Sequence, residues 1–177
     1  AADLITELQP EYQYVAGRLL MTKLRKEVFG QHDPEDFSKH IEEKIALGKY
    51  DGELLDNYSV GDIAELGAYI DHDKDMNYTY AAMCQWRDKY LVKNRVTGEH
   101  YESPQQAIML IGMYLFMQYP PETRKGFVEK FYNAVSDMKI SLPTPIMGGV
   151  RTPTKQFSSC TKIEVGDSLS SINGGVC

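Results

Sequence analysis

The segment from Gln105 to Tyr119, QQAIMLIGMYLFMQY, constrains the fold more than any other part of the chain. It is long enough for about four helical turns and is apolar on nearly every side, so a helix formed from it must be surrounded by other elements. Pro120 and Pro121 follow, and proline interrupts a helix because it lacks the backbone N–H. The segment therefore predicts a buried helix in a mainly α-helical fold.

Apolar residues at helical spacing predict further, amphipathic helices. In the first of these, Pro10 stands at a first helical position and Gly30 ends the pattern. Ser59 and Asp62 have the spacing of a capping box, which marks the start of a short helix. The predicted amphipathic segments are residues 10–30, 33–48, 59–70, 79–90 and 121–138.

Three further segments have patterns that are not typical of a helix. YLVKNRVTGEHYES, residues 90–103, has β-branched and aromatic residues around a Thr97-Gly98 turn and favours a small hairpin. Prolines and glycines between residues 143 and 153 exclude a helix and predict a long, functional loop. The alternation in residues 161–165 then predicts a strand whose first residue is Cys160, so a helical block is followed by the start of a second architectural unit.

Composition limits the possible functions. The chain has 177 residues, of which 42% are hydrophobic and 25% charged, as expected for a globular protein with one domain or little more. No apolar run reaches the roughly 20 residues of a membrane span, and the N-terminus does not resemble a secretion signal. The net charge of −6, without a Lys/Arg block, argues against a nucleic acid polymer as partner. Three dispersed cysteines suggest reduced thiols and a cytoplasmic location.

Several motifs are set aside. Residues 71–75, DHDKD, begin like a calcium loop, but Met76 and Ala82 occupy the positions of the required glycine and glutamate. His32, His40 and His100 lack partners at metal-ligand spacing, so no metal site is predicted. Cys84 is interpreted as a small core residue. Gly148-Gly149 fits neither a dinucleotide fingerprint nor a P-loop.

The segment RTPTKQFSSCTKIEVGD, residues 151–167, contains the best candidates for chemistry. Hydroxyls and backbone N–H groups of an irregular loop can hold phosphate oxygens, and a thiol at a strand end, Cys160, is firmly placed for reaction. On the residues alone, catalytic and structural roles are about equally supported. The hydroxyl residues near Cys160 are Thr144, Thr152, Thr154, Ser158 and Ser159.

The run SLPTPIMGGVRTPTKQFSSCTKIEVGDSLSSIN, residues 141–173, closely resembles the large catalytic (alpha) subunit of class I aerobic ribonucleotide reductase. It resembles the point where the helical N-terminal domain enters a ten-stranded α/β barrel. The resemblance extends upstream through GKYDGELLDNYS, YIDHDKDMNYTYAA, KYLVKNRVTGEHYES and FYNAVSDMKI, and so covers nearly the entire chain. It implies a helical domain with a small β-hairpin over residues 1–140, and a substrate loop with the first barrel strand over residues 141–177.

The resemblance implies the following roles in reducing ribonucleoside diphosphates to deoxyribonucleoside diphosphates. Cys160 matches one of two thiols that supply the reducing equivalents and become a disulfide. Thr144 matches a residue that contacts the phosphates of the nucleoside diphosphate substrate, and Ser159 one beside the ribose. Asp167 matches the residue that holds the deoxyribose of an allosteric dNTP. The residues adjoining Asp167 at this specificity site are Ser168 and Leu169.

The resemblance also implies cofactors and partners. We expect no cofactor on this chain, a dNTP or ATP as allosteric effector, and a metal-radical cofactor in a separate small (beta) subunit. Thioredoxin or glutaredoxin would re-reduce the thiols. The family's second reducing cysteine, its radical cysteine and its ATP-binding cone have no match in this sequence, so we expect a split subunit whose other fragment completes the barrel. The alternative is a non-catalytic, truncated or processed N-terminal domain that acts in assembly.

Overall fold

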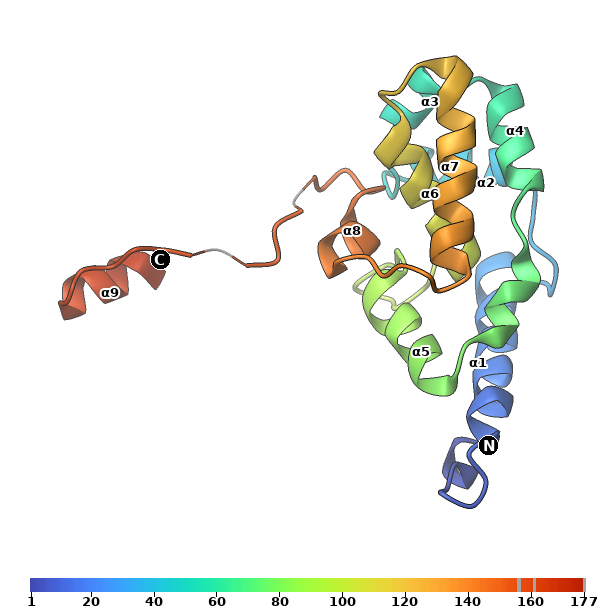
Figure 1. The fold of residues 1–177 in the computed structure, drawn as a ribbon, viewed down its shortest axis with the longest axis horizontal. Coiled ribbons are helices and arrows are strands. Elements are labelled where there is room, and N and C mark those ends of the chain that lie inside the picture. The colour runs from blue at the N-terminus through green and yellow to red at the C-terminus, as the bar shows by residue number, and fades with distance from the viewer. Residues whose placement is uncertain (156, 161, 177) are drawn as a thin grey trace.

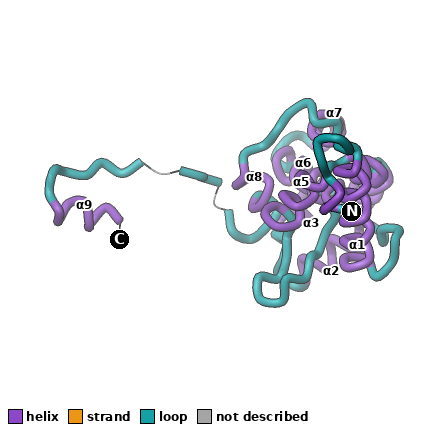
Figure 2. The backbone as a smooth tube through the Cα atoms, turned by 90° about the horizontal axis from the view of Figure 1, so that it is seen from below, coloured by secondary structure: helices purple, strands orange, loops and turns teal. Residues whose placement is uncertain are grey.

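The computed structural model describes residues 1–155, 157–160 and 162–176. Over these residues the chain consists of helices and loops, with a helical body and a C-terminal arm that leaves it (Figures 1 and 2). No strand occurs in this part of the chain. The helical elements are η1 (Ala2–Leu4), α1 (Tyr12–Phe29), α2 (Phe37–Ala46), α3 (Glu53–Asn57), α4 (Val60–Ala68), η2 (His72–Asn77), α5 (Tyr80–Gln85), η3 (Trp86–Tyr90), α6 (Pro104–Phe116), α7 (Pro121–Ser136), α8 (Thr144–Gly149) and α9 (Leu169–Val176).

Helix α6 forms the centre of the body, as its all-round apolar sequence predicts. Residues 104–114 are all buried, and Ile108 to Ile111 have no exposed surface. Helix α7 packs along α6 at short range: a Cβ at Gly112 would lie 2.8 Å from Phe131 Cδ1. The two helices can therefore pack this closely only because Gly112 has no side chain.

Helix α1 packs against η2 and α5 on another side of the body. The approach is close at Gly17, where a Cβ would lie only 2.3 Å from the carbonyl oxygen of Tyr78. Gly30, at the C-terminal end of α1, adopts φ +68°, the left-handed conformation that ends many helices. The predicted end of this helix is thus confirmed.

The other predicted helices form with small changes at their ends. Ser59 and Asp62 make the predicted capping box of α4. The second helix begins later than predicted: Asp36, not Asp33, is its N-cap, and its carboxylate accepts the Lys39 N–H at 2.9 Å. Residues 80–90 form α5 followed by one π-helical turn, η3.

The prediction that residues 143–153 exclude a helix is wrong. Helix α8 spans Thr144–Gly149, with Pro143 as its N-cap residue and Pro145 in its first turn. The first N–H groups of a helix have no partner within the helix, so prolines at these positions remove no hydrogen bond. The two glycines lie at the other end of α8, where they interrupt nothing.

The predicted hairpin over residues 90–103 is also wrong as a pair of strands. The Thr97-Gly98 turn forms, with Gly98 at φ +79°, but pairing is limited to one antiparallel bridge, between Lys93 and His100. One reason is that the Val92 N–H donates to the side chain of Glu102 at 2.6 Å. The ladder therefore cannot extend toward α6.

The first barrel strand is not supported either. Cys160, the predicted first residue, and residues 162–165 are not in a strand, and Thr161 lies outside the described residues. A strand is defined by hydrogen bonds to a neighbouring strand, and the described part of the chain offers none. Instead the arm ends in α9, which folds back so that a Cβ at Gly175 would meet Val165 Cγ1 at 2.6 Å.

Within the described ranges, no helix combines the length and apolar character needed to cross a bilayer.

Candidate functional site

A hollow of about 860 Å³ lies beside α8, and we call it the α8 hollow. Two segments form its walls: the segment from Asp88 to Arg95, and α8 with the loop that follows. Gly48 and Lys49, from the end of α2, close one side. The lining residues are Gly48, Lys49, Asp88, Lys89, Tyr90, Leu91, Val92, Lys93, Arg95, Thr144, Pro145, Gly148, Gly149, Thr152, Pro153, Thr154 and Ser158.

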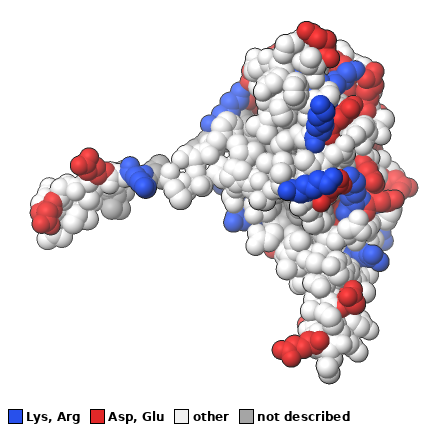
Figure 3. Space-filling model, viewed as in Figure 1, with Lys and Arg blue, Asp and Glu red and all other residues white. Residues whose placement is uncertain are grey.

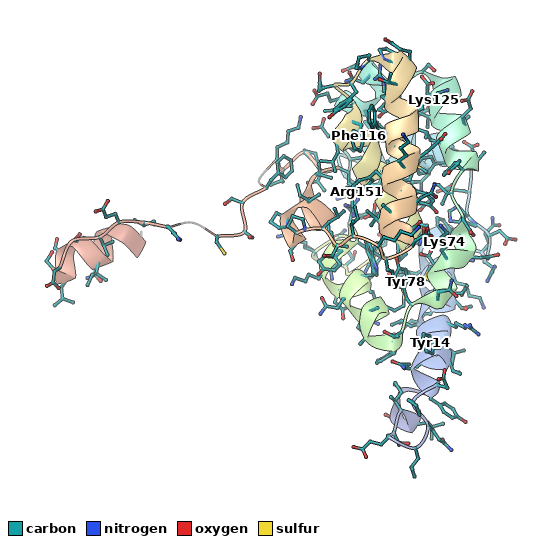
Figure 4. All side chains as sticks on the ribbon, in the orientation of Figure 1. Tyr14, Lys74, Tyr78, Phe116, Lys125 and Arg151 are labelled. Atoms are coloured by element: carbon teal, nitrogen blue, oxygen red, sulfur yellow. The ribbon has the colours of Figure 1, made fainter. Side chains whose placement is uncertain are left out.

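A buried ion pair between Arg151 and Glu102 fixes the two walls relative to each other. Both side chains are fully buried, and Arg151 Nε donates to Glu102 Oε2 at 2.8 Å. The remaining guanidinium N–H groups donate to the carbonyls of Met147, on α8, and Tyr90, on the opposite wall. Figure 4 shows Arg151 inside the body. Burial alone would lower the pKa of Arg151, but the charge and hydrogen bonds of Glu102 raise it, so the guanidinium keeps its charge inside the body.

A chain of polar side chains continues from Glu102 into the body. The Tyr50 hydroxyl donates to Glu102 Oε2 at 2.9 Å, and His40 Nε2 lies 3.2 Å from the same hydroxyl. Burial raises the pKa of Tyr50 and lowers that of His40. His40 Nδ1 is 3.1 Å from Glu35. Both ring nitrogens of His40 thus lie within hydrogen-bonding distance of a neighbour, and the network supports the wall from within.

The loop after α8 has its own attachment to the body. Lys155 Nζ lies 2.8 Å from Asp51 Oδ2 and also contacts the Glu53 carboxylate. Hydrogen bonds to these two carboxylates raise the pKa of Lys155. The Asp51 N–H donates to the Arg151 carbonyl at 3.0 Å. Residues 151–155 are therefore held against α3, and the arm begins beyond them.

The predicted site residues fall in three separate places. Thr144 is exposed on the α8 hollow. Ser159 and Cys160 are exposed on the arm, where Ser159 Oγ lies 4.0 Å from Cys160 Sγ. Asp167, Ser168 and Leu169 are exposed at the start of α9, and the Ser168 hydroxyl accepts the Ser171 N–H at 3.2 Å. The structure thus brings Ser159 close to Cys160 but does not bring the three groups together (Figure 1).

Sequence reasoning missed the cations of the α8 hollow: Lys49, Lys89, Lys93 and Arg95. Basic and acidic side chains are mixed over the face of the body drawn in Figure 3, so overall charge gives no sign of a basic site. A local signal was present, because KYLVKNR, residues 89–95, holds three cations and no acid. In the sequence this segment was interpreted as part of a hairpin and of the family resemblance, and not as a basic site.

The histidines and the cysteine that were set aside differ in their surroundings. His100 Nδ1 lies 2.6 Å from Glu27 Oε1 and its Nε2 lies 2.8 Å from the Arg87 carbonyl. His32 is exposed and Cys84 is half-buried. Across the described residues, no three His, Cys, Asp or Glu side chains are grouped as they would be around a metal ion.

Asp75, in the rejected calcium-like motif, is a fully buried carboxyl group between η2 and α1. Arg25 Nη2 is 4.0 Å from Asp75 Oδ2, and neither carboxylate oxygen has a hydrogen-bond partner among the described residues. Burial raises the pKa of Asp75 to about 7, although the Arg25 charge opposes the shift. This group is distant from the predicted site residues in sequence and bears on stability.

Comparison with known families defines the class of protein. The ribonucleotide reductase all-alpha domain family matches residues 76–155, which contain both walls of the α8 hollow and the Arg151–Glu102 pair. Residues 76–155 of the helical body therefore match a reductase all-α domain.

Similarity to individual proteins defines the subunit. The chain is 54% identical over 173 residues to ribonucleoside-diphosphate reductase 1 subunit alpha of Escherichia coli (strain K12), covering 98% of this chain and 23% of that protein. It is 53% identical over the same length to the subunit alpha of Enterobacteria phage T4, and 30% identical over 178 residues to that of Synechocystis. The chain belongs to the ribonucleoside-diphosphate reductase alpha-subunit family, and it spans about a quarter of the length of these relatives.

Proposed function

We propose that this chain forms part of the catalytic subunit of a ribonucleotide reductase, which reduces ribonucleoside diphosphates to deoxyribonucleoside diphosphates. The observation that carries the proposal is the 54% identity to a reductase alpha subunit over 98% of the chain, residue 160 included. The rest of the alpha subunit, on the same or a partner polypeptide, is needed to complete the barrel.

Cys160 is proposed as one of two reducing thiols. In the overall step the ribose 2'-hydroxyl leaves as water and a hydrogen takes its place, while two thiols lose two electrons and form a disulfide. Cys160 supplies one sulfur of that disulfide, and the second comes from the remaining polypeptide. A dithiol protein such as thioredoxin or glutaredoxin then reduces the disulfide by thiol exchange. The exposed position of Cys160 is compatible with both partners.

Two further sites are proposed on the same chain. Thr144 contacts the substrate phosphates, which is supported by its exposure on the α8 hollow, and Ser159 contacts the ribose beside Cys160. Asp167, with Ser168 and Leu169, holds an allosteric dNTP that sets substrate specificity. A separate beta subunit carries the metal-radical cofactor that starts the reaction.

The test is Cys160→Ser in the assembled enzyme, with Cys84→Ser as the matched control. We expect turnover with thioredoxin to be lost in the first variant and retained in the second, while size-exclusion chromatography shows unchanged assembly for both. Turnover equal to that of the wild type in Cys160→Ser would contradict the proposed role. Copurification that recovers only this chain, with no remaining alpha polypeptide, would favour the non-catalytic assembly role.

A further inference from the structure

Helix α8 carries Thr144, but its own side chains do not hold it in place. It has six residues, none of them buried, and its N-cap residue, Pro143, makes no side-chain cap. Isolated helices of this length are not stable in water, so contacts outside the helix must fix it. The first fully buried side chain after α8 is that of Arg151, two residues beyond the end of the helix.

Arg151 attaches α8 to the body through hydrogen bonds on both sides of its backbone position. Its guanidinium donates to the carbonyl of Met147, in α8, and to the carbonyl of Tyr90, at the end of η3. Its own carbonyl accepts the Asp51 N–H at 3.0 Å. The place of α8 therefore depends on how the guanidinium of Arg151 is oriented.

Glu102 and Tyr50 fix that orientation from inside the body. The Arg151 Nε donates to both carboxylate oxygens of Glu102, at 2.8 and 3.1 Å, and the Tyr50 hydroxyl donates to the same carboxylate at 2.9 Å. None of the three side chains is more than 1% exposed. Burial, together with the negative charge of Glu102, raises the pKa of Tyr50, so its hydroxyl remains a donor at neutral pH.

We propose that Tyr50 and Glu102 are positioning residues of the reductase: through Arg151 they set the place of α8, and so of the Thr144 hydroxyl, relative to the substrate. The inference rests on the proposed function, in which Thr144 contacts the substrate phosphates. Neither Tyr50 nor Glu102 is among the described residues that line the α8 hollow, so both act through Arg151 and not by touching the substrate. A displacement of about 1 Å can cost roughly 100-fold in rate, so small shifts of α8 are measurable.

The test is Tyr50→Phe in the assembled enzyme, with Tyr58→Phe as the matched control. Both changes remove one hydroxyl from a buried ring, but the Tyr58 hydroxyl donates to the Met113 carbonyl, at 2.9 Å, and not to Glu102. Weakening a charge-assisted hydrogen bond between Thr144 and phosphate should raise the substrate KM about tenfold in Tyr50→Phe. We expect kcat to stay within about twofold, because a phosphate contact acts equally in the bound and transition states.

The same change in a Thr144→Val background decides whether Tyr50 acts through α8. Valine removes the hydroxyl, so Thr144→Val should itself raise KM to a similar extent. We expect Tyr50→Phe to change KM less than about twofold in that background, because two changes that remove one contact are not additive. A KM unchanged in Tyr50→Phe, a tenfold effect in both backgrounds, or equal increases in Tyr50→Phe and Tyr58→Phe would overturn the inference.

Amide hydrogen exchange in the 177-residue chain gives a second readout, which needs no turnover. The Val150 N–H donates to the Ile146 carbonyl at the end of α8, at 3.4 Å. We expect this amide to exchange faster in Tyr50→Phe than in the wild type, and at the wild-type rate in Tyr58→Phe, because only the first change loosens Arg151. Equal exchange in all three proteins would contradict the coupling of Tyr50 to α8.

The two readouts separate this inference from the catalytic proposal. If α8 exchanges faster only in Tyr50→Phe but Cys160→Ser leaves turnover intact, the coupling of Tyr50 to α8 stands and the catalytic proposal fails. If turnover depends on Cys160 but neither KM nor exchange at α8 responds to Tyr50→Phe, the catalytic proposal stands and the inference fails.

Discussion

Replacement of Arg151 by methionine tests the pair that fixes the walls of the α8 hollow. Methionine keeps much of the aliphatic volume but removes every guanidinium donor. Glu102 would then remain a fully buried carboxylate without its cation, and the carbonyls of Met147 and Tyr90 would each lose a hydrogen bond. Breaking a buried pair by removing one partner costs about 3–5 kcal/mol, mainly through the charge left behind.

The stability lost in Arg151→Met has a charge part and a packing part, and Glu102→Gln separates the two. In the double variant Arg151→Met/Glu102→Gln, the amide oxygen still accepts from the Val92 N–H or the Tyr50 hydroxyl, but no charge is buried. We therefore expect the double variant to be more stable than Arg151→Met alone by at least about 1 kcal/mol, the scale of an unsatisfied buried group.

Urea unfolding at pH 7, followed by circular dichroism, measures these differences through the midpoint and slope. A loss below about 1 kcal/mol in Arg151→Met, or a double variant whose loss equals the sum of the single losses, would refute the reasoning.

Three other predictions concern the body. Asp75→Asn should remove much of the fall in stability between pH 4 and pH 8. The pKa of Asp75 rises from 3.8 in the unfolded chain to about 7 in the folded one, which corresponds to about 4 kcal/mol of destabilisation. This destabilisation is fully present only above pH 7. Urea midpoints of both proteins across that range test it, and parallel profiles would contradict it. Gly17→Ala, which places a Cβ 2.3 Å from the Tyr78 carbonyl oxygen, should cost about 1–3 kcal/mol. Gly126→Ala, with nothing within 4 Å, should instead stabilise by about 0.5–1 kcal/mol, and thermal melts that rank the two alike would refute the packing argument. Ser59→Ala should cost about 1 kcal/mol by removing the cap of α4, whereas Ser59→Thr should not; equal melting temperatures would exclude the cap as a source of stability.

The helices of the body were largely predictable because their signals are local. The apolar segment 105–119 required a buried helix, and Gly30 and Ser59 marked helix ends through backbone conformation and capping. Helix α8 was missed because its prolines were judged as helix breakers without regard to position. In the first turn of a helix they break no hydrogen bond.

The candidate site was predictable only in part. The sequence singled out the hydroxyls near Cys160, and Thr144 and Ser158 do line the α8 hollow. The cations of the hollow were missed because Lys89 and Thr144 are more than fifty residues apart, and no local pattern reports that they line the same hollow. The roles of the arm residues, from Ser159 to Leu169, stay predictions.

The sequence by itself determined most of the helical segments, which of them is central, and which family the chain resembles, because periodicity, capping and similarity are properties of residue order. The tertiary structure alone decided that Arg151 and Glu102, 49 positions apart, would form a buried pair, and that cations would gather beside α8. Burial and charge balance depend on which distant segments come together, so they are fixed only when the chain has folded.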